Sequence, residues 1–399
     1  MLYDRGLHEL LPRRRWSAEE ERETVHSIVR DAAAAWNSVT WWPPHPDEQG
    51  AANEPESIVY CGAAGTLWGL DYLRRVGYDS DFDLTGAARV IPPEVRPELR
   101  EGPWVPTSYM LGDLGVLLVK ALLFGDIPAR VLVQQRIEAN LDDRACELFC
   151  GTTGSMVAAR FMFEKFGSPI WRELFTRSFD ALWSRWEERA KGIYLWSMSL
   201  YDRPVHSFVG AGHGFAGNVA VMLASAELID ESRRNELKRR ATDTVKALAH
   251  RENGRANWPR YFGEPSDTPV QWCHGASSIV ASFAAMPADH DPELNALLIE
   301  GGELVWEAGP LSTIGKGCGI CHGAAGSSFA LLKLYRRTGD TLWLERARVF
   351  AMHAIDQMRA QHKHWGRPWY SLWTGDIGVA LALNACLTED DRICSFDAW

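Results

Sequence analysis

The sequence lacks an excess of basic residues and any long apolar run. Of its 399 residues, 42 are Lys or Arg and 52 are Asp or Glu, which gives a formal net charge of −10. This balance does not favour a surface that binds nucleic acids or anionic membranes. The most apolar run, LGVLLVKALLFG, is too short to cross a bilayer and contains Lys120. We therefore expect no membrane span and no nucleic-acid partner.

A signal peptide and a dense set of cysteines are also missing. The first residues show neither an apolar core nor a cleavage site of small residues, so we expect a cytoplasmic protein. Eight cysteines in 399 residues are too few for a disulfide framework, which leaves free thiols, metal ligands or catalytic groups. The cysteines that we interpret as buried apolar residues are Cys61, Cys146, Cys150, Cys386 and Cys394.

What the sequence does contain is a repeat. Pairs of small residues three positions apart, each followed by an apolar run, occur seven times, as in YCGAAGTLWGL and WTGDIGVALAL. The first glycines of these motifs follow one another at intervals of 39 to 63 residues. They are Gly62, Gly112, Gly151, Gly214, Gly275, Gly323 and Gly375. The pattern predicts seven similar structural units.

The apolar pattern of the repeat predicts helices in two layers. Each motif opens a segment that is apolar nearly all round, and amphipathic segments lie between the motifs. One of these follows a capping box, Ser17 to Glu20. No segment alternates with period two, so strands have little support. We predict an all-α fold, an α/α toroid with seven inner and seven outer helices, whose inner helix starts present unpaired N–H groups at the mouth of a central cavity.

We expect a single domain over residues 1–399. Residues 1–57 would form an N-terminal segment with the first outer helix, residues 58–384 carry the glycine motifs, and residues 385–399 would form a C-terminal tail.

Three irregular stretches interrupt the repeat. Residues 79–107 are rich in proline and acidic residues, and residues 202–209 and 256–270 also break the rhythm. We predict loops over one rim, which either carry binding residues or serve only packing.

Three of the motifs carry cysteine or histidine where an inner helix is predicted to begin. These residues are His213, Cys273, His274, Cys321 and His322. The starts of inner helices converge in a closed ring, so the side chains can meet. Two thiolates and one imidazole suit zinc and leave its fourth position open to a substrate. Cys273 and Cys321 both stand two residues before the first glycine of their motif, a shared register that favours one site.

Two other interpretations of these residues remain open. Cys318 and Cys321 form a C-x-x-C pair in the sequence CGIC, so Cys318 is a competing ligand. The Cys-His pairs are also compatible with simple packing at helix starts.

The motifs WCHGA, GCGICHGAAG, GAGHGFAG and YSLWTGDIGVALAL resemble the signature motifs of the lanthionine synthetase C-like family, the lanthipeptide cyclases and their eukaryotic relatives. The resemblance extends over residues 58–384 and is most specific within residues 210–326. It implies a seven-plus-seven toroid that holds Zn²⁺, with Cys273, Cys321 and His322 as ligands.

The resemblance implies roles for three further residues. His213 would be the acid/base residue, and Glu147 matches a family acidic position that could orient His213 or the substrate. Lys316 matches a lysine that contacts glutathione in the eukaryotic-type members, and the lack of an arginine shortly before Cys273 is similar to that branch. For each of these three, a structural role is the alternative. Family members usually have Pro-Gly after WCHGA, and Ser277–Ser278 in its place predicts different packing there.

Together these residues predict an enzyme that adds a thiol, from glutathione or a peptide cysteine, to dehydroalanine or dehydrobutyrine. Zinc would convert the thiol to a thiolate, and His213 would protonate the α-carbon. A dehydratase or kinase is a further candidate partner. The alternatives are a zinc-containing thiol-binding or scaffolding protein without turnover, a zinc prenyltransferase, and a glycosidase that uses Glu147, Asp113 and Asp376.

Overall fold

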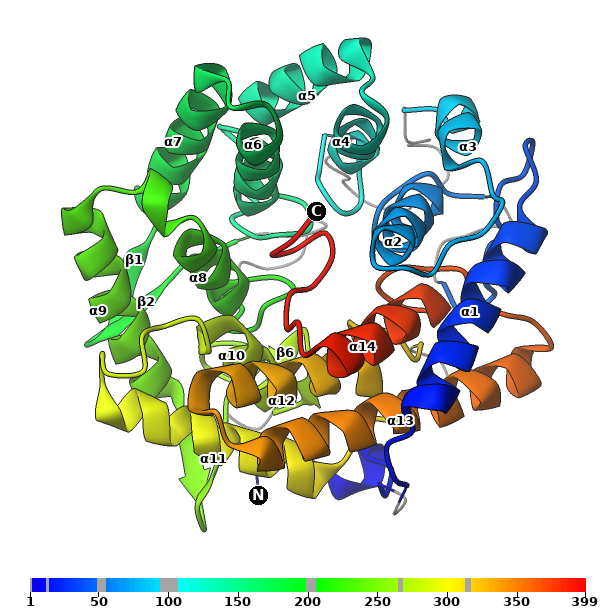
Figure 1. Ribbon diagram of the computed structural model, residues 1–399. Coiled ribbons are helices and arrows are strands. Elements are labelled where there is room, and N and C mark those ends of the chain that lie inside the picture. The colour runs from blue at the N-terminus through cyan, green and yellow to red at the C-terminus, as the bar shows by residue number, and fades with distance from the viewer. Residues whose placement is uncertain are drawn as a thin grey trace.

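The computed structural model describes residues 2–11, 14–48, 55–93, 107–198, 206–264, 268–312 and 317–399. Within these ranges fourteen α-helices form two concentric layers, one inside the other (Figure 1). The predicted all-α toroid of seven inner and seven outer helices is therefore confirmed.

The inner helices begin directly after the seven motif glycines. They are α2 (Ala63–Arg75), α4 (Asp113–Phe124), α6 (Thr152–Phe166), α8 (Phe215–Ala224), α10 (Ala276–Phe283), α12 (Ala324–Thr338) and α14 (Asp376–Thr388). Neighbouring inner helices pack together in chain order and α14 packs against α2, so the ring closes. Their side chains are buried nearly all round, as the apolar pattern predicted.

The first N–H groups of several inner helices are hydrogen-bonded. The prediction that these N–H groups would be unpaired is therefore wrong for those helices. Each such helix follows a loop that folds back on it, and the first amide donates to a carbonyl seven residues earlier. These bonds run from Ala63 to Glu56, from Thr152 to Ala145, from Phe215 to Phe208 and from Asp376 to Trp369, with N···O distances of 2.8–3.1 Å. Buried amides need partners, and here the loops supply them.

The outer helices cover the ring and begin at polar caps. They are α1 (Ala18–Ala35), α3 (Leu84–Val90), α5 (Ile127–Ala139), α7 (Pro169–Trp183), α9 (Glu231–Leu248), α11 (Pro292–Ala308) and α13 (Thr341–Trp365). The Ser17 half of the predicted capping box is present, because its hydroxyl accepts a hydrogen bond from the Glu20 N–H. The Glu20 carboxylate pairs with Arg14 instead of completing the box. Helix α3 lies inside the predicted loop 79–107, where Asp83 caps it by accepting from the Gly86 N–H.

Three short antiparallel strand pairs and two 3₁₀ turns complete the described structure. The pairs are β1 (Glu187–Ala190) with β2 (Ile193–Leu195), β3 (His250–Glu252) with β4 (Arg255–Asn257), and β5 (Val270–Gln271) with β6 (His274–Gly275). The 3₁₀ turns are η1 (Arg5–Leu7) and η3 (Ala226–Leu228). The hairpin between β3 and β4 turns at Asn253–Gly254, where both residues have positive φ. Positive φ at both central residues of a two-residue hairpin loop favours Asn-Gly, which explains why this pair stands here.

The chain after α14 runs into the centre of the ring (Figure 1). The backbone carbonyl of Ser395 accepts from the Tyr109 hydroxyl at 2.6 Å, and that of Phe396 accepts from Arg160 at 2.9 Å. Lys333 forms an ion pair with Asp397 at 2.7 Å. The predicted C-terminal tail, residues 385–399, therefore begins within α14, and the part after this helix belongs to the packed interior of the ring.

Among the described residues, no helix is long and apolar enough to cross a membrane. The single domain over residues 1–399 and its three segments stay a prediction. Limited proteolysis tests it, since one cooperative unit should be cut first within residues 79–107 and should not release two separately stable fragments.

Candidate metal centre

Backbone hydrogen bonds join the loops before the inner helices at one common position, two residues before the first glycine. These bonds run from Cys321 to Trp373, from Trp373 to Tyr60, from Tyr60 to Met110 and from Met110 to Phe149, with N···O distances of 2.9–3.2 Å. The Gly212 N–H likewise donates to the Cys273 carbonyl at 3.3 Å. Residues in the same register thus become neighbours around the ring, which explains why a shared register places Cys273 and Cys321 together.

The loops before α10 and α12 bring two thiols and one imidazole into a cluster. The ligand atoms of Cys273, Cys321 and His322 all lie within 4.8 Å of one another. Cys321 Sγ lies 3.6 Å from His322 Nε2. Both cysteines are buried, whereas His322 is half-buried. In the part of the chain that the structure describes, this is the one group of three or more residues arranged to hold a metal ion.

Glycines bring the Cys321 loop close to the seventh motif. Gly317 has φ +83°, and a Cβ at this position would lie 2.2 Å from the Thr374 carbonyl oxygen. The Gly319 N–H donates to that same oxygen at 3.0 Å. A side chain at either position would displace the loop, so this close approach requires glycine at residues 317 and 319.

The pKa values of the two thiols are shifted in opposite directions. Burial opposes ionisation, but a hydrogen bond from Cys321 and the nearby imidazoles of His274 and His322 outweigh it and hold the pKa of Cys273 well below its usual range. Burial and the charge on Cys273 raise the pKa of Cys321. Gln271 Nε2 also donates to Cys273 Sγ at 2.8 Å. One thiolate is therefore stabilised before any metal is considered.

Tyr60 belongs to this centre and was missed by the sequence analysis. Burial and a hydrogen bond with Cys321 raise the pKa of the Tyr60 phenol well above its usual range, so it stays neutral beside the thiols. Its ring packs against Phe149 at 5.1 Å. A signal was available, since Tyr60 occupies the same register as Cys273 and Cys321, two residues before a first glycine.

His213 lies next to the cluster and is held by Glu147. His213 Nδ1 lies 3.2 Å from Glu147 Oε2, and the Glu147 carboxylate also accepts from the N–H groups of Phe149 and Cys150. Burial alone would lower the pKa of His213, but the bond to Glu147, its charge and the Cys273 thiolate raise it. The Glu147 side chain is fully buried while that of His213 is 26% exposed. The pair is a buried carboxylate that orients an accessible imidazole.

The residues around Cys273 explain the Ser277–Ser278 pair. Ser278 Oγ accepts from the Ala211 N–H at 2.6 Å, and Ser277 Oγ lies 3.2 Å from Ser327 Oγ. The two serines therefore connect α10 to the fourth and sixth motifs. The His274 ring beside Cys273 is buried, and burial lowers its pKa to about 4.

The competing zinc ligand and two acids of the glycosidase alternative lie outside the Cys-Cys-His cluster. Cys318 Sγ lies 3.9 Å from Asp376 Oδ1, outside the cluster. Asp113 pairs with Arg136 at 2.7 Å and Asp376 with His362 at 2.7 Å.

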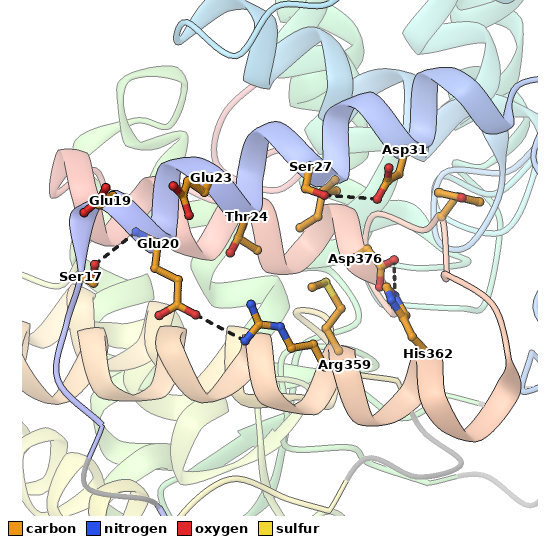
Figure 2. Close-up of a pocket in the computed structure, with 13 residues that line it drawn as sticks. Ser17, Glu19, Glu20, Glu23, Thr24, Ser27, Asp31, Arg359, His362 and Asp376 are labelled. Carbon is orange, nitrogen blue, oxygen red and sulfur yellow. Dashed lines mark hydrogen bonds and ion pairs between the residues drawn. The ribbon is translucent and has the colours of Figure 1, made fainter.

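Each of the three acids in the glycosidase alternative is therefore paired with a different basic side chain. Figure 2 shows Asp376 and His362 at one end of a pocket of about 540 Å³ between α1 and α13, on the outside of the inner ring. This pocket does not include the cysteines. Lys316 falls outside the described residues, so its role stays a prediction.

The donor set fits zinc. With zinc–sulfur and zinc–nitrogen bonds of about 2.3 and 2.0 Å, tetrahedral ligand atoms lie roughly 3.5–4 Å apart, so minor side-chain adjustment suffices. Two sulfurs and one imidazole are soft and borderline donors, which magnesium and calcium disfavour. Zinc ligation by Cys273, Cys321 and His322 itself stays a prediction.

Fold and site together define the class, an α/α toroid with a Cys-Cys-His donor set and a histidine–carboxylate pair where its inner helices begin. The chain belongs to the lanthionine synthetase C-like family, whose model matches residues 6–397. The nisin cyclase structure superimposes with a TM-score of 0.61 over 93% of this chain and 95% of that chain, at 14% identity.

Two curated relatives agree with the family assignment. Glutathione S-transferase LANCL1 of Danio rerio is 25% identical over 290 residues, 69% of each chain. LanC-like protein GCL1 of Arabidopsis thaliana is 34% identical over 151 residues. That match covers 37% of this chain and 32% of GCL1, about a third of the relative's length.

Proposed function

We propose that this protein is a zinc-dependent enzyme that adds the thiol of glutathione or of a peptide cysteine to a dehydroalanine or dehydrobutyrine residue. The observation that carries the proposal is the convergence of Cys273, Cys321 and His322 beside the His213–Glu147 pair. Zinc, when bound, would lower the pKa of a substrate thiol and favour the thiolate.

The residues of this chain account for the remaining steps. The new bond joins the substrate sulfur to the β-carbon, and the electron pair of the alkene moves to the α-carbon and its neighbouring carbonyl. Protonated His213, oriented by Glu147, delivers the proton to the α-carbon. The thiol proton and the added proton balance, so no oxidant or further reactant is needed.

Glutathione is supported as the donor by the name of the Danio rerio relative, a glutathione S-transferase. Loss of water from serine or threonine, or of phosphate from their phosphorylated forms, gives such an alkene. We therefore propose a dehydratase, or a kinase that first phosphorylates the hydroxyl, as the partner that supplies the acceptor. A cytoplasmic location remains part of this proposal.

Mass spectrometry of a dehydroalanine-containing peptide incubated with glutathione, with and without the zinc-loaded protein, tests the function. The expected result is faster growth of the thioether adduct with the protein present. A second peptide carries its own cysteine and reports cyclisation. No acceleration with either peptide would favour the zinc-containing thiol-binding or scaffolding protein instead.

A further inference from the structure

Glu48 lies outside every glycine motif, in the segment between α1 and α2, yet its carboxylate reaches the seventh motif. Oε1 accepts hydrogen bonds from Trp369 Nε1 at 2.5 Å and from Thr374 Oγ1 at 3.1 Å. Glu48 also forms a hydrogen bond with the Cys61 thiol. Cys61 and Thr374 stand directly before the first glycines of their motifs. One side chain therefore joins the starts of the first and last inner helices.

Thr374, which donates to Glu48, also contacts the loop that carries Cys321. The Thr374 carbonyl accepts from the Gly319 N–H at 3.0 Å, and the Trp373 carbonyl accepts from the Cys321 N–H at 2.9 Å. A Cβ on Gly319 would lie 2.7 Å from the Thr374 carbonyl carbon. Because the Thr374 backbone and the Cys321 loop are in direct contact, a shift of Thr374 would move Cys321 as well.

His45 fixes the orientation of Trp369, the other donor to Glu48. The two rings are parallel within 4°, with centroids 3.8 Å apart, and the His45 side chain is 3% exposed. The His45 Nε2 atom is buried without a hydrogen-bond partner among the described residues. Burial lowers the pKa of His45 to about 4, so a neutral ring stacks on Trp369.

The environment of Glu48 favours its protonated form. Burial raises the pKa of Glu48 to about 8, against the hydrogen bonds from Trp369, Thr374 and Cys61, and the neighbouring Glu56 carboxylate raises it further. Tyr370 also lines the small pocket around Glu48, together with His45 and Cys61. A neutral acid accepts both hydrogen bonds without placing a buried negative charge beside the seventh motif.

We propose that Glu48 is a positioning residue that fixes the Thr374 backbone and, through it, the loop that carries Cys321 into the metal centre. The kinetic part of this inference rests on the proposed function. The metal-binding part does not, because it concerns only the preformed arrangement of Cys321 beside Cys273.

Cobalt binding to the metal-free full chain tests the inference. Bound Co²⁺ is counted per chain, and its affinity and thiolate-to-cobalt absorption are measured for the wild type, Glu48→Gln, Glu48→Ala and a control, Glu19→Gln. Gln keeps the acceptor oxygen but cannot ionise, and Glu19 makes the same chemical change on the exposed face of α1. Melting curves report whether each variant is folded.

At pH 7 we expect Glu48→Gln and Glu19→Gln to match the wild type within about twofold. Glu48→Ala should weaken cobalt affinity by about tenfold and reduce the thiolate absorption, the scale seen when a residue behind a metal ligand is removed. Between pH 7 and pH 9 the wild type should lose affinity relative to Glu48→Gln, because only the wild type gains a charge there. In thiol addition, Glu48→Ala should lower kcat with little change in KM, and Gln should restore it.

Three results would overturn the inference: wild-type affinity in Glu48→Ala, equal losses in Gln and Ala, or parallel pH profiles of the wild type and Glu48→Gln. If Glu48→Ala does not fold, the Gln pH profile and Trp369→Phe, which removes one donor to Glu48, decide it. Normal cobalt behaviour without thiol addition would reject the proposed function and leave the role of Glu48 standing.

Discussion

The two layers of the ring begin their helices in different ways. Six of the seven outer helices start at a side-chain cap in which an oxygen accepts a hydrogen bond from the first turn. These caps are Ser17, Asp83, Asp126, Asp230, Asp291 and Asp340. All seven inner helices start at glycine, and none has a side-chain cap.

This difference means that outer helix starts contribute to local stability, whereas inner helix starts position the residues of the candidate site. A polar cap stabilises its own helix and presents little else to the rest of the molecule. A glycine start allows the preceding loop to fold onto the helix, which places the two residues before the glycine side by side with those of the neighbouring motif. His213, Cys273, Cys321 and His322 all occupy these two positions. Substitutions at inner starts should therefore affect function most, and those at outer starts should affect only stability.

The largest effect is expected for Cys321→Ala, which removes one of the two clustered sulfurs. We expect loss of bound zinc and of thiol addition together, measured by metal analysis and by adduct formation. Cys318→Ala is the matched control, because Cys318 lies beside Asp376, and it should keep both. Full zinc occupancy in Cys321→Ala with loss in Cys318→Ala would move the site to the competing cysteine.

Gly65→Ala should destabilise the start of α2 while leaving all three predicted metal ligands in the chain. A Cβ on Gly65 would lie 1.9 Å from the Val59 carbonyl oxygen, a backbone atom that cannot rotate away. We expect the free energy of unfolding to fall by about 3 kcal/mol, as for severe overpacking. Denaturant unfolding measures it, and a loss below about 1 kcal/mol would contradict the close packing of this loop.

His213→Asn should retain zinc and slow thiol addition by about 100-fold or more, the usual effect of losing a general acid. The pKa of His213 is raised, so the protonated form persists to higher pH than for a free imidazole. The wild-type rate should therefore be sustained at low pH and fall as pH rises through that pKa, and the variant should lack this decline. An unchanged pH profile would assign the proton transfer to another group.

Lys316→Ala should weaken the use of glutathione more than that of a neutral thiol. A charge-assisted contact with a substrate carboxylate is worth about 1.5–3 kcal/mol at best. The comparison of KM values for glutathione and for a neutral thiol measures this effect. Equal changes for both thiols would make Lys316 a solvated loop residue.

The smallest effect is expected at an outer start. Asp126 Oδ1 accepts from the Ala129 N–H at 3.0 Å and caps α5. Asp126→Ala should lower the free energy of unfolding by about 1 kcal/mol and leave zinc content and kcat unchanged. Asp126→Asn keeps the cap and is the control. A change in kcat for Asp126→Ala would contradict the expectation that outer helix starts affect only stability.

Much of the architecture could be predicted from the sequence, because it depends on patterns that repeat. Seven small-residue motifs followed by apolar segments predicted the inner helices, and all seven first glycines are their N-caps. The same register predicted that Cys273 and Cys321 would meet. The family was also evident from motifs around these residues, since glycine, cysteine and histidine at fixed positions are visible without coordinates.

Only the tertiary structure decided which residues outside the motifs support the centre. Glu48 reaches Trp369 and Thr374 across more than three hundred residues of chain, and no local pattern predicts such a contact. The structure likewise separated Cys318 from the cluster. Cys318 and Cys321 are three residues apart in sequence, but the backbone between them directs one thiol toward Asp376 and the other toward Cys273. Sequence spacing bounds the distance between two side chains, whereas packing determines their directions.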